Sequence, residues 1–371
     1  MKLVSVMTTD SAGGAEFAAV EMLDALVERG HECVLLSDTT GIGRGTRVRV
    51  EPIDIGPKLS LRTYATLALR WPLLLRRLRR ALQAEAPYDV LLVHYKKEQL
   101  MARWLPPALQ ATLAWAEWGP VPFPMRRSLP RRMFLAAARP VKVIMAVSSG
   151  TKDSLADVGI PADRITIVPN VLRTDDIDFT ADGRAAVRTR LDIPPEAFVV
   201  GLISRFHPKK RNDVVIEAVA RMGPDVHLIL AGAGETQAEL ERLGAPLGQR
   251  LHIIDTPRDD VADVLSAFDV SVFCPSPTEG APRAVILGML ARRACVSTGR
   301  EGVWDMITPD LGFITEPEND PAALAAVLER YRADPSLVQR HGEAARTHAA
   351  ATYAAPVVAA SIEQLLQPES A

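Results

Sequence analysis

Short apolar runs alternate with amphipathic stretches along almost the whole chain. One series of apolar runs is expected to form strands at residues 2–8, 32–38, 89–95, 141–148 and 165–170. A second series follows at residues 198–204, 225–232, 251–255, 269–275 and 294–299. Runs that are apolar throughout are typical of strands buried on both faces of a parallel sheet. The pattern therefore predicts an α/β protein with helices between parallel strands.

Helical periodicity fills the intervals between these runs. Residues 16–30 place apolar side chains on one face at a spacing near 3.6, and the pattern stops at Gly30, a suitable left-handed cap. The carboxy-terminal part is also helical in pattern, with breaks expected at Pro335 and Pro356.

A polar, irregular stretch at residues 172–183 separates the two series of strands. We therefore expect an amino-terminal Rossmann-like domain at 1–175 and a carboxy-terminal Rossmann-like domain at 176–350. The helix at 351–371 is expected to return to the first domain. A chain of 371 residues, 48% of them hydrophobic, is long enough for two such cores.

Several protein classes are made improbable by the composition. No uncharged apolar run approaches the ~18 residues of a membrane helix. The opening MKLVSVMTTD becomes polar too soon for a secretory signal and reads as a first strand. The three cysteines form no CxxC pair, and no His/Cys cluster has metal-ligand spacing. We expect a cytoplasmic protein without a metal.

Charge is unevenly divided although the net charge is only −2. Residues 1–175 hold 24 Lys and Arg against 17 Asp and Glu, whereas the remainder holds 19 against 28. Residues 55–84 and 118–152 are rich in arginine and contain no acid. Either these are solvated helix faces, or the amino-terminal half meets an anionic partner.

Two polar motifs follow predicted strands of the second series. Arg205 and Lys210 come after the run that ends at residue 203, and Glu279-Gly280 comes after the run that ends at residue 275. In doubly wound α/β domains, ligands collect outside the carboxyl ends of the strands. Two cations suit a diphosphate and a carboxylate suits sugar hydroxyls, so the pair predicts a site for a phosphorylated sugar conjugate.

Motifs along nearly the whole chain resemble those of glycosyltransferase family 4. They are, in order, GGAEFAAVEMLDALVERGHEC, VSSGTKDSLADVGIPADRITIVPNV, ISRFHPKKRNDVVIEAV, LILAGAGE and PSPTEGAPRAVILGMLA. The resemblance implies the GT-B fold, in which two Rossmann-like domains face each other across a cleft. It also implies a retaining enzyme that uses a nucleotide sugar as co-substrate and needs no cofactor.

The resemblance assigns roles to individual residues. Arg205 and Lys210 match the basic pair that grips the donor diphosphate, which makes a metal unnecessary. Glu279 matches the first acid of the family's E-x7-E signature, near the transferred sugar, although it could instead cap the following helix. Contacts to the donor through glycine-rich or tight backbone turns are implied for Gly13, Gly14, Gly232, Gly234, Gly280, Ala281 and Pro282.

Departures from the family pattern concern the donor and the transferred sugar. Leu287 stands where the family usually has a second acid for the ribose. Either another carboxylate such as Asp305 takes over this contact, or the donor carries a deoxyribose, as a dTDP-sugar does. Trp118 stands where many members have a histidine. Glu117 before it is a candidate catalytic or acceptor contact, or else a rim residue.

The predicted helix in the first arginine-rich window is amphipathic. Its leucines at 74, 75, 78 and 82 could contact anionic lipid at the inner membrane face, or could equally pack on the sheet. Nucleic acid is a poor partner, because the net charge is negative and aromatic residues make up only 5% of the chain.

The sequence thus predicts a retaining glycosyltransferase that moves a sugar from a nucleotide diphosphate to an acceptor hydroxyl. The acceptor is expected to be a small molecule such as a natural product, a polysaccharide precursor or a lipid-linked glycan. Two alternatives stay open at this point: a non-catalytic binding subunit of glycosyltransferase type, and a transferase that joins a cyclitol or aminosugar to an unusual acceptor.

Overall fold

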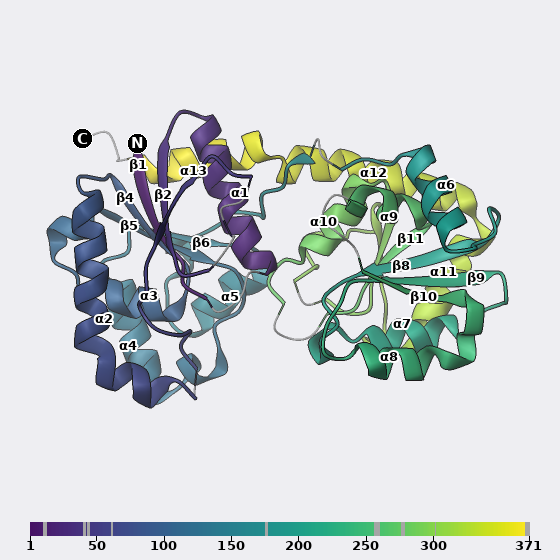
Figure 1. The fold of residues 1–371 in the computed structure, drawn as a ribbon, viewed down its shortest axis with the longest axis horizontal. Coiled ribbons are helices and arrows are strands. Elements are labelled where there is room, and N and C mark those ends of the chain that lie inside the picture. Colours follow the sequence, from purple (N-terminus) through teal and green to yellow (C-terminus); the bar gives the residue numbers. More distant parts are fainter. Residues whose placement is uncertain are drawn as a thin grey trace. The chain divides into compact units, whose positions relative to one another are not determined.

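The computed structural model describes residues 1–9, 13–39, 42, 45–60, 62–174, 177–255, 260–275, 279–300 and 302–367. They form two compact units, which we call unit 1 (residues 1–172 and 355–371) and unit 2 (residues 173–354). The boundaries expected from the sequence were 175/176 and 350/351; Asp175 and Asp176 lie outside the described residues. Each unit contains one sheet with helices on both of its faces (Figure 1).

Unit 1 contains a seven-stranded parallel sheet in the order β3-β2-β1-β4-β5-β6-β7. The strands are β1 (Lys2–Val6), β2 (Glu32–Ser37), β3 (Arg49–Pro52), β4 (Val90–Val93), β5 (Thr112–Glu117), β6 (Val143–Ala146) and β7 (Ile165–Ile167). The helices are α1 (Gly14–Glu28), α2 (Tyr64–Glu85), α3 (Lys96–Ala102), α4 (Ser128–Ala138), α5 (Ser149–Asp157) and α13 (Ala355–Leu366), with short 3-10 helices η1 (Pro107–Leu109), η2 (Phe123–Arg126) and η3 (Ala162–Arg164).

Two apolar layers sandwich the sheet of unit 1. Val4 and Val6 of β1 face a layer formed with α2, α4 and α5, whereas Leu3 and Met7 face a layer formed with α1 and α13. The alternation follows from the two-residue period of a strand. Helix α13 comes from the far end of the chain and packs on α1, where Arg29 also pairs with Glu363.

Unit 2 contains a six-stranded parallel sheet in the order β10-β9-β8-β11-β12-β13. The strands are β8 (Phe198–Ile203), β9 (Val226–Ala231), β10 (Leu251–Ile254), β11 (Val270–Phe273), β12 (Ala294–Ser297) and β13 (Gly312–Ile314). The helices are α6 (Ala181–Arg190), α7 (Asn212–Val219), α8 (Gln237–Gly244), α9 (Val261–Ala267), α10 (Arg283–Leu290), α11 (Pro321–Ala333) and α12 (Pro335–Tyr353), with η5 (Pro208–Lys210) and η6 (Ala245–Arg250).

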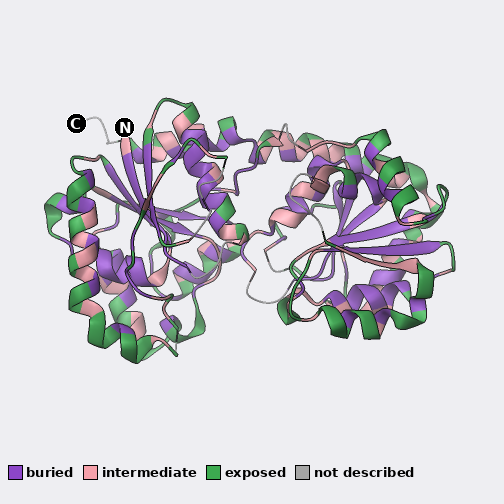
Figure 2. Cartoon of the chain, in the orientation of Figure 1, coloured by how far each residue is buried: buried purple, intermediate pink, exposed green. Residues whose placement is uncertain are grey.

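The parallel sheets predicted from the buried runs are confirmed, and the central strands are buried in both units (Figure 2). Gly30 has a φ of 89°, the left-handed conformation expected at the end of α1. The sequence pattern missed three strands. β3 and β13 are short strands at sheet edges, while β5 is buried but rich in alanine, which has low β-propensity.

Helix α2 resolves the choice left open for the first arginine-rich window. Leu74, Leu78 and Leu82 are buried against the sheet in the core of unit 1, and Leu75 is partly buried on the same core. The interpretation of these four leucines as a lipid-facing surface is therefore wrong. Within the described ranges, no helix combines the length and apolar character needed to cross a bilayer.

Candidate functional site

The sheet of unit 2 reverses its strand order between β8 and β11. The chain proceeds from β8 outward through β9 to β10, and then from β11 outward through β12 to β13. At such a switch point, the loops after the two central strands diverge and leave room for a ligand at their carboxyl ends. Residues 204–211 follow β8, and residues 279–282 belong to the connection after β11.

Lys210 and Glu279 bridge this switch point. Lys210 ends η5, and its Nζ donates to Glu279 Oε1 at 2.6 Å. Nζ also lies 5.6 Å from the centre of the Phe273 ring, at the end of β11. Their side chains are 24% and 17% exposed, so the pair remains accessible to a ligand while each charge is held in place by the other.

Arg205 lies in the same loop but is exposed. It makes no hydrogen bond or ion pair with any other residue that the structure describes. Its loop is held by backbone bonds on both sides, since Ser204 N donates to Ala231 O at 3.1 Å and Phe206 N donates to Ala233 O at 2.9 Å. A cation on a fixed backbone with an unengaged guanidinium suits an incoming anion.

Gly232 and Gly234 lie against the backbone of this loop. A Cβ at Gly232 would lie 2.0 Å from Ser204 O, and a Cβ at Gly234 would lie 2.2 Å from Phe206 O. Both residues also have positive φ, at 146° and 158°. The glycines are therefore needed for the close approach to the Arg205 loop, and their expected contact with the donor stays a prediction.

Gly280, Ala281 and Pro282 lead into the amino-terminus of α10, whose first N–H groups can attract an anion. Gly302 packs against Gly280, because a Cβ there would lie 2.9 Å from Gly280 O. Residues 276–278 of the predicted motif lie outside the described residues. Gly302 has a φ of 72°, but its sequence context carries no signal for this contact.

Leu287 packs, half-buried, against the apolar cluster that includes α6 and α9. Its side chain therefore contributes to the core of unit 2, and its expected contact with the donor stays a prediction. Asp305, the proposed substitute carboxylate, is exposed in the turn that follows Gly302. That turn lies next to Gly280, which keeps Asp305 a candidate.

Unit 1 has its own switch point, between β1 and β4. Gly13 caps α1, and its N–H donates to Glu16 Oε2 at 2.9 Å; Gly14 is the first helical residue. The Tyr95 hydroxyl, beyond β4, donates to Glu16 Oε1. The glycine turn thus opens a 15-residue helix whose amino-terminal N–H groups offer partial positive charge.

His94 follows β4 and contacts Trp118, the residue found where the family has a histidine. The indole N–H donates to His94 Nδ1 at 3.0 Å, and the rings are stacked at 5.8 Å. An indole can only donate, so Nε2 carries the proton and donates to Ser5 Oγ at 2.7 Å. Burial lowers the pKa of His94 to about 3, so the imidazole is neutral near pH 7.

A buried charged run after β4 was missed by the sequence analysis. Lys97, Glu98 and Gln99 are at most 1% exposed. Thr8 N–H, after β1, donates to Glu98 Oε1 at 3.2 Å, so these residues bridge the switch point of unit 1. Burial raises the pKa of Glu98. The sequence did carry a signal for this site, because the four polar residues Lys96 to Gln99 directly follow the apolar run predicted at 89–95.

Glu117 ends β5 and is 4% exposed. Lys96 Nζ lies 2.7 and 2.5 Å from its two carboxylate oxygens, and Gln99 Nε2 donates to Oε1 at 2.9 Å. Burial lowers the pKa of Lys96, while Glu117 opposes that change. The carboxylate is thus held in a buried ion pair, which offers a structural explanation beside its predicted catalytic role.

Each unit therefore presents polar residues at the carboxyl ends of its central strands. In unit 2 the set contains a guanidinium with no partner among the described residues, an ion-paired ammonium and a helix amino-terminus, a combination that can bind a diphosphate. Across the described part of the chain, no three His, Cys, Asp or Glu side chains form a group that could hold a metal ion.

Comparisons with known proteins agree with the fold. Residues 12–176 match the model of Glycosyltransferase Family 4, and residues 184–348 match Glycosyl transferases group 1. The solved structure of Anabaena HepE with UDP-glucose has a TM-score of 0.83 at 20% identity and covers 99% of both chains. WaaG, a glycosyltransferase of lipopolysaccharide biosynthesis, has a TM-score of 0.70 at 18% identity.

Curated relatives match over most of the chain. The lipopolysaccharide core biosynthesis glycosyltransferase LpsE of Rhizobium meliloti is 29% identical over 89% of each protein. A D-inositol 3-phosphate glycosyltransferase of Xylanimonas cellulosilytica is 26% identical over 91% of this chain and 88% of its own. The chain belongs to glycosyltransferase family 4 and is a nucleotide-sugar-dependent glycosyltransferase with two Rossmann-like domains of the GT-B type.

Proposed function

We propose that the protein transfers a sugar, with retention of anomeric configuration, from a nucleotide diphosphate to an acceptor hydroxyl. The observation that carries this proposal is the pairing of Lys210 with Glu279 across the switch point of unit 2, beside the exposed Arg205. Arg205 and Lys210 would bind the donor diphosphate, and Glu279 would contact the transferred sugar.

In the proposed reaction, the bond between the anomeric carbon and the diphosphate oxygen breaks on the same face on which the acceptor oxygen bonds. The acceptor proton passes to the departing phosphate oxygen, so no separate protein base is needed. Arg205 and Lys210 stabilise the negative charge that develops on the leaving group. A mechanism without a protein base also agrees with the ion pair that Glu117 forms with Lys96.

We expect the acceptor to be a lipid-linked glycan, because the relative LpsE is named for lipopolysaccharide core biosynthesis. A small phosphorylated cyclitol is the second candidate, since several relatives are named D-inositol 3-phosphate glycosyltransferases.

Donor binding and stereochemistry test the proposal together. Competitive binding of UDP, GDP and dTDP reports the nucleotide, and preference for dTDP would support the deoxyribose explanation of Leu287. NMR of the product of the preferred sugar donor then reports the anomeric configuration. Retention is expected; an inverted product would contradict the mechanism, and absence of binding by any nucleoside diphosphate would contradict the donor site.

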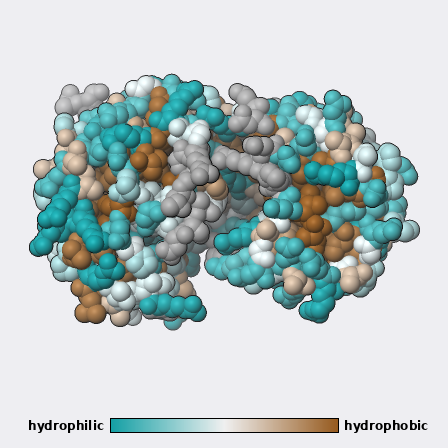
Figure 3. Space-filling view, in the orientation of Figure 1, coloured by the Kyte–Doolittle hydropathy of each residue, from teal (hydrophilic) through white to brown (hydrophobic). Residues whose placement is uncertain are grey.

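An apolar and basic surface of unit 1 is a candidate for lipid contact. Helices α2 and α4 cover the same sheet face, so their outer sides point away from it together. The large exposed apolar residues there are Tyr64, Leu69, Leu73, Leu129 and Met133. Exposed arginines include Arg70, Arg76, Arg80 and Arg132. Figure 3 shows hydrophobic atoms among hydrophilic ones over this part of unit 1. Such a mixture suits an anionic membrane surface.

Co-sedimentation with liposomes tests this membrane contact. We expect binding to vesicles with phosphatidylglycerol at low salt, and weaker binding at high salt. The double variant Leu69→Ser/Leu73→Ser should bind roughly fivefold more weakly, because two exposed apolar side chains are lost. Val357→Ser, in α13, is the matched control and should bind normally. Sedimentation that does not depend on anionic lipid would contradict the proposal.

A further inference from the structure

Unit 2 contains a polar cavity at the amino-terminal ends of its strands, whereas the candidate donor site lies at their carboxyl ends. Its volume is about 560 Å³, within the usual range for small-molecule sites. Its lining residues lie just before β8, β9, β11 and β12 and on α6, α11 and α12, and they include Arg184, Arg292, Arg293, Asp269 and Gln339. The donor motifs lie at the other ends of these strands.

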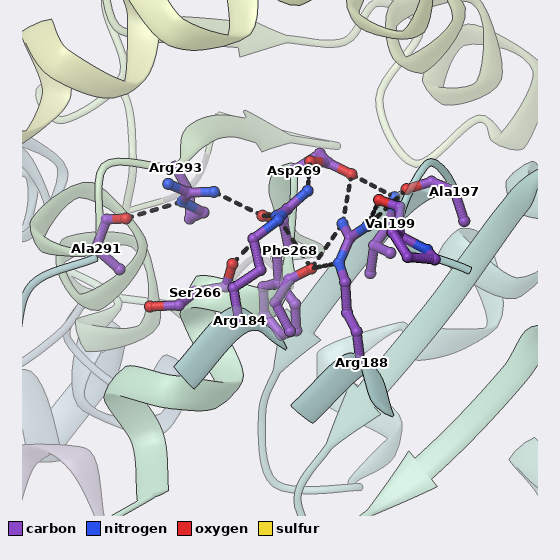
Figure 4. Close-up of polar contacts among 11 residues, drawn as sticks. Arg184, Arg188, Ala197, Val199, Ser266, Phe268, Asp269, Ala291 and Arg293 are labelled. Carbon is purple, nitrogen blue, oxygen red and sulfur yellow. Dashed lines mark hydrogen bonds and ion pairs between the residues drawn. The ribbon is translucent and has the colours of Figure 1, made fainter. Parts of the chain in front are cut away.

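Two guanidinium groups pair with one carboxylate beside this cavity, and a third lies next to them (Figure 4). Arg184 Nη2 and Arg188 Nη2 pair with the two oxygens of Asp269, at 2.7 and 2.9 Å. Arg293 joins them by donating to Phe268 O at 2.7 Å and to Ala291 O at 2.8 Å. Arg293 pairs with no carboxylate among the residues that the structure describes. The cluster therefore holds an excess of positive charge.

Helix ends account for part of this arrangement. Arg184 and Arg188 donate to carbonyl groups at the end of α9, where cations are favourable. Arg188 is only 4% exposed and does not line the cavity. Its Nε and Nη2 donate to Ala267 O, and its Nη1 donates to Pro195 O and Ala197 O. Arg188 is thus explained as a structural residue.

Helix ends explain only part of Arg293, which donates to the carbonyls of the residues that cap α9 and α10 and lies over the Phe179 ring, 4.7 Å from its centre. Arg293 lines the cavity and is only 9% exposed, and its Nη2 makes no hydrogen bond within the described part of the chain. Burial and the neighbouring Arg184 lower its pKa to about 10. Asp269 opposes this shift without contacting Arg293 directly. A buried guanidinium that no carboxylate contacts is costly, and a bound anion would lower that cost.

At the rim of the cavity, carboxylates outnumber arginines among the described lining residues. Arg292 pairs with Asp178 and Glu343, and Arg332 pairs with Asp225 at 3.0 Å. The rim also contains Glu196. Attraction for an anion is therefore confined to the floor, while carboxylates at the rim can accept hydrogen bonds from hydroxyl groups.

We propose that this cavity binds a phosphoryl group at Arg293 and Arg184, supplied either by inorganic phosphate or by a small sugar phosphate. Such a site is separate from the donor site and does not rest on the proposed transfer reaction. Ligand bound there would tie together the connections that precede β8, β11 and β12 and so stabilise unit 2.

The test uses the full chain carrying Arg205→Ala and Lys210→Ala, which removes the expected diphosphate contacts. Equilibrium dialysis with radiolabelled inorganic phosphate should show one saturable site, and thermal unfolding should shift upward with phosphate. Adding Arg293→Gln should weaken binding about tenfold or more, because a charge-assisted hydrogen bond is lost. Arg340→Gln removes an equal charge outside the cavity and should leave binding unchanged.

A second variant, Gln339→Trp, tests the site if Arg293→Gln does not fold. Gln339 is exposed at the cavity, so the indole would obstruct it without removing an arginine. Tighter binding of glucose 6-phosphate than of phosphate supports a sugar phosphate, and equal binding supports inorganic phosphate. No saturable binding, equal loss in Arg340→Gln, or full binding in Gln339→Trp would overturn the proposal.

Discussion

Replacing Arg205 or Lys210 by alanine is expected to lower turnover by ~10²-fold or more, the usual effect of losing one donor to a transition-state charge. Both residues belong to the loop after β8, at the switch point of unit 2. Lys210→Ala would also leave Glu279 without its present cation. The measurement is kcat and KM with the preferred nucleotide sugar.

Lys209→Ala is the matched control for both variants. Lys209 is an exposed lysine between them in the same loop, so its loss changes the charge equally without removing an expected diphosphate contact. We expect its turnover to stay within about threefold of the wild-type value, a change smaller than that of a lost transition-state donor. Near-normal turnover of Arg205→Ala and Lys210→Ala, or an equal loss in Lys209→Ala, would refute the assignment of the diphosphate site.

Replacing Lys96 by methionine is expected to destabilise unit 1 by about 3–5 kcal/mol, the usual effect of removing one partner of a buried ion pair. Lys96 and Glu117 are only 13% and 4% exposed, and Lys96 contacts both carboxylate oxygens. The variant would leave the Glu117 charge buried with Gln99 as its remaining donor. Changing both residues, as Lys96→Met/Glu117→Gln, should recover part of the loss.

Urea unfolding followed by tryptophan fluorescence measures this effect. Four of the five tryptophans, Trp71, Trp104, Trp115 and Trp118, belong to unit 1, so the signal reports mainly on that unit. Arg29→Met is the control, because the Arg29–Glu363 pair is more exposed and should contribute much less to stability. A loss for Lys96→Met as small as that of the control would show that the buried pair is not important for stability.

The candidate site illustrates two kinds of sequence information. Arg205, Lys210 and Glu279 follow recognisable strands, so the apolar pattern alone places the loops that hold them at strand ends. Lys96 to Gln99 have the same position after β4, but a charged run is usually solvated, and its burial depends on neighbours from β1 and β5. The contact of Gly302 with Gly280 could not be predicted either, because it too depends on residues brought together by the fold.

Local pattern was sufficient for the fold class and for most strands, because apolar period and strand-end chemistry are properties of neighbouring residues. It failed for β5 and for the outward-facing residues of α2, where Leu69 and Leu73 are exposed instead of Leu74 and Leu78. Contacts between distant segments required the assembled sheets, since strand order brings Lys210 to Glu279 across 69 positions. The same holds for Arg184 of α6 and Arg293 before β12, which share one cavity because α6 packs near the start of that strand.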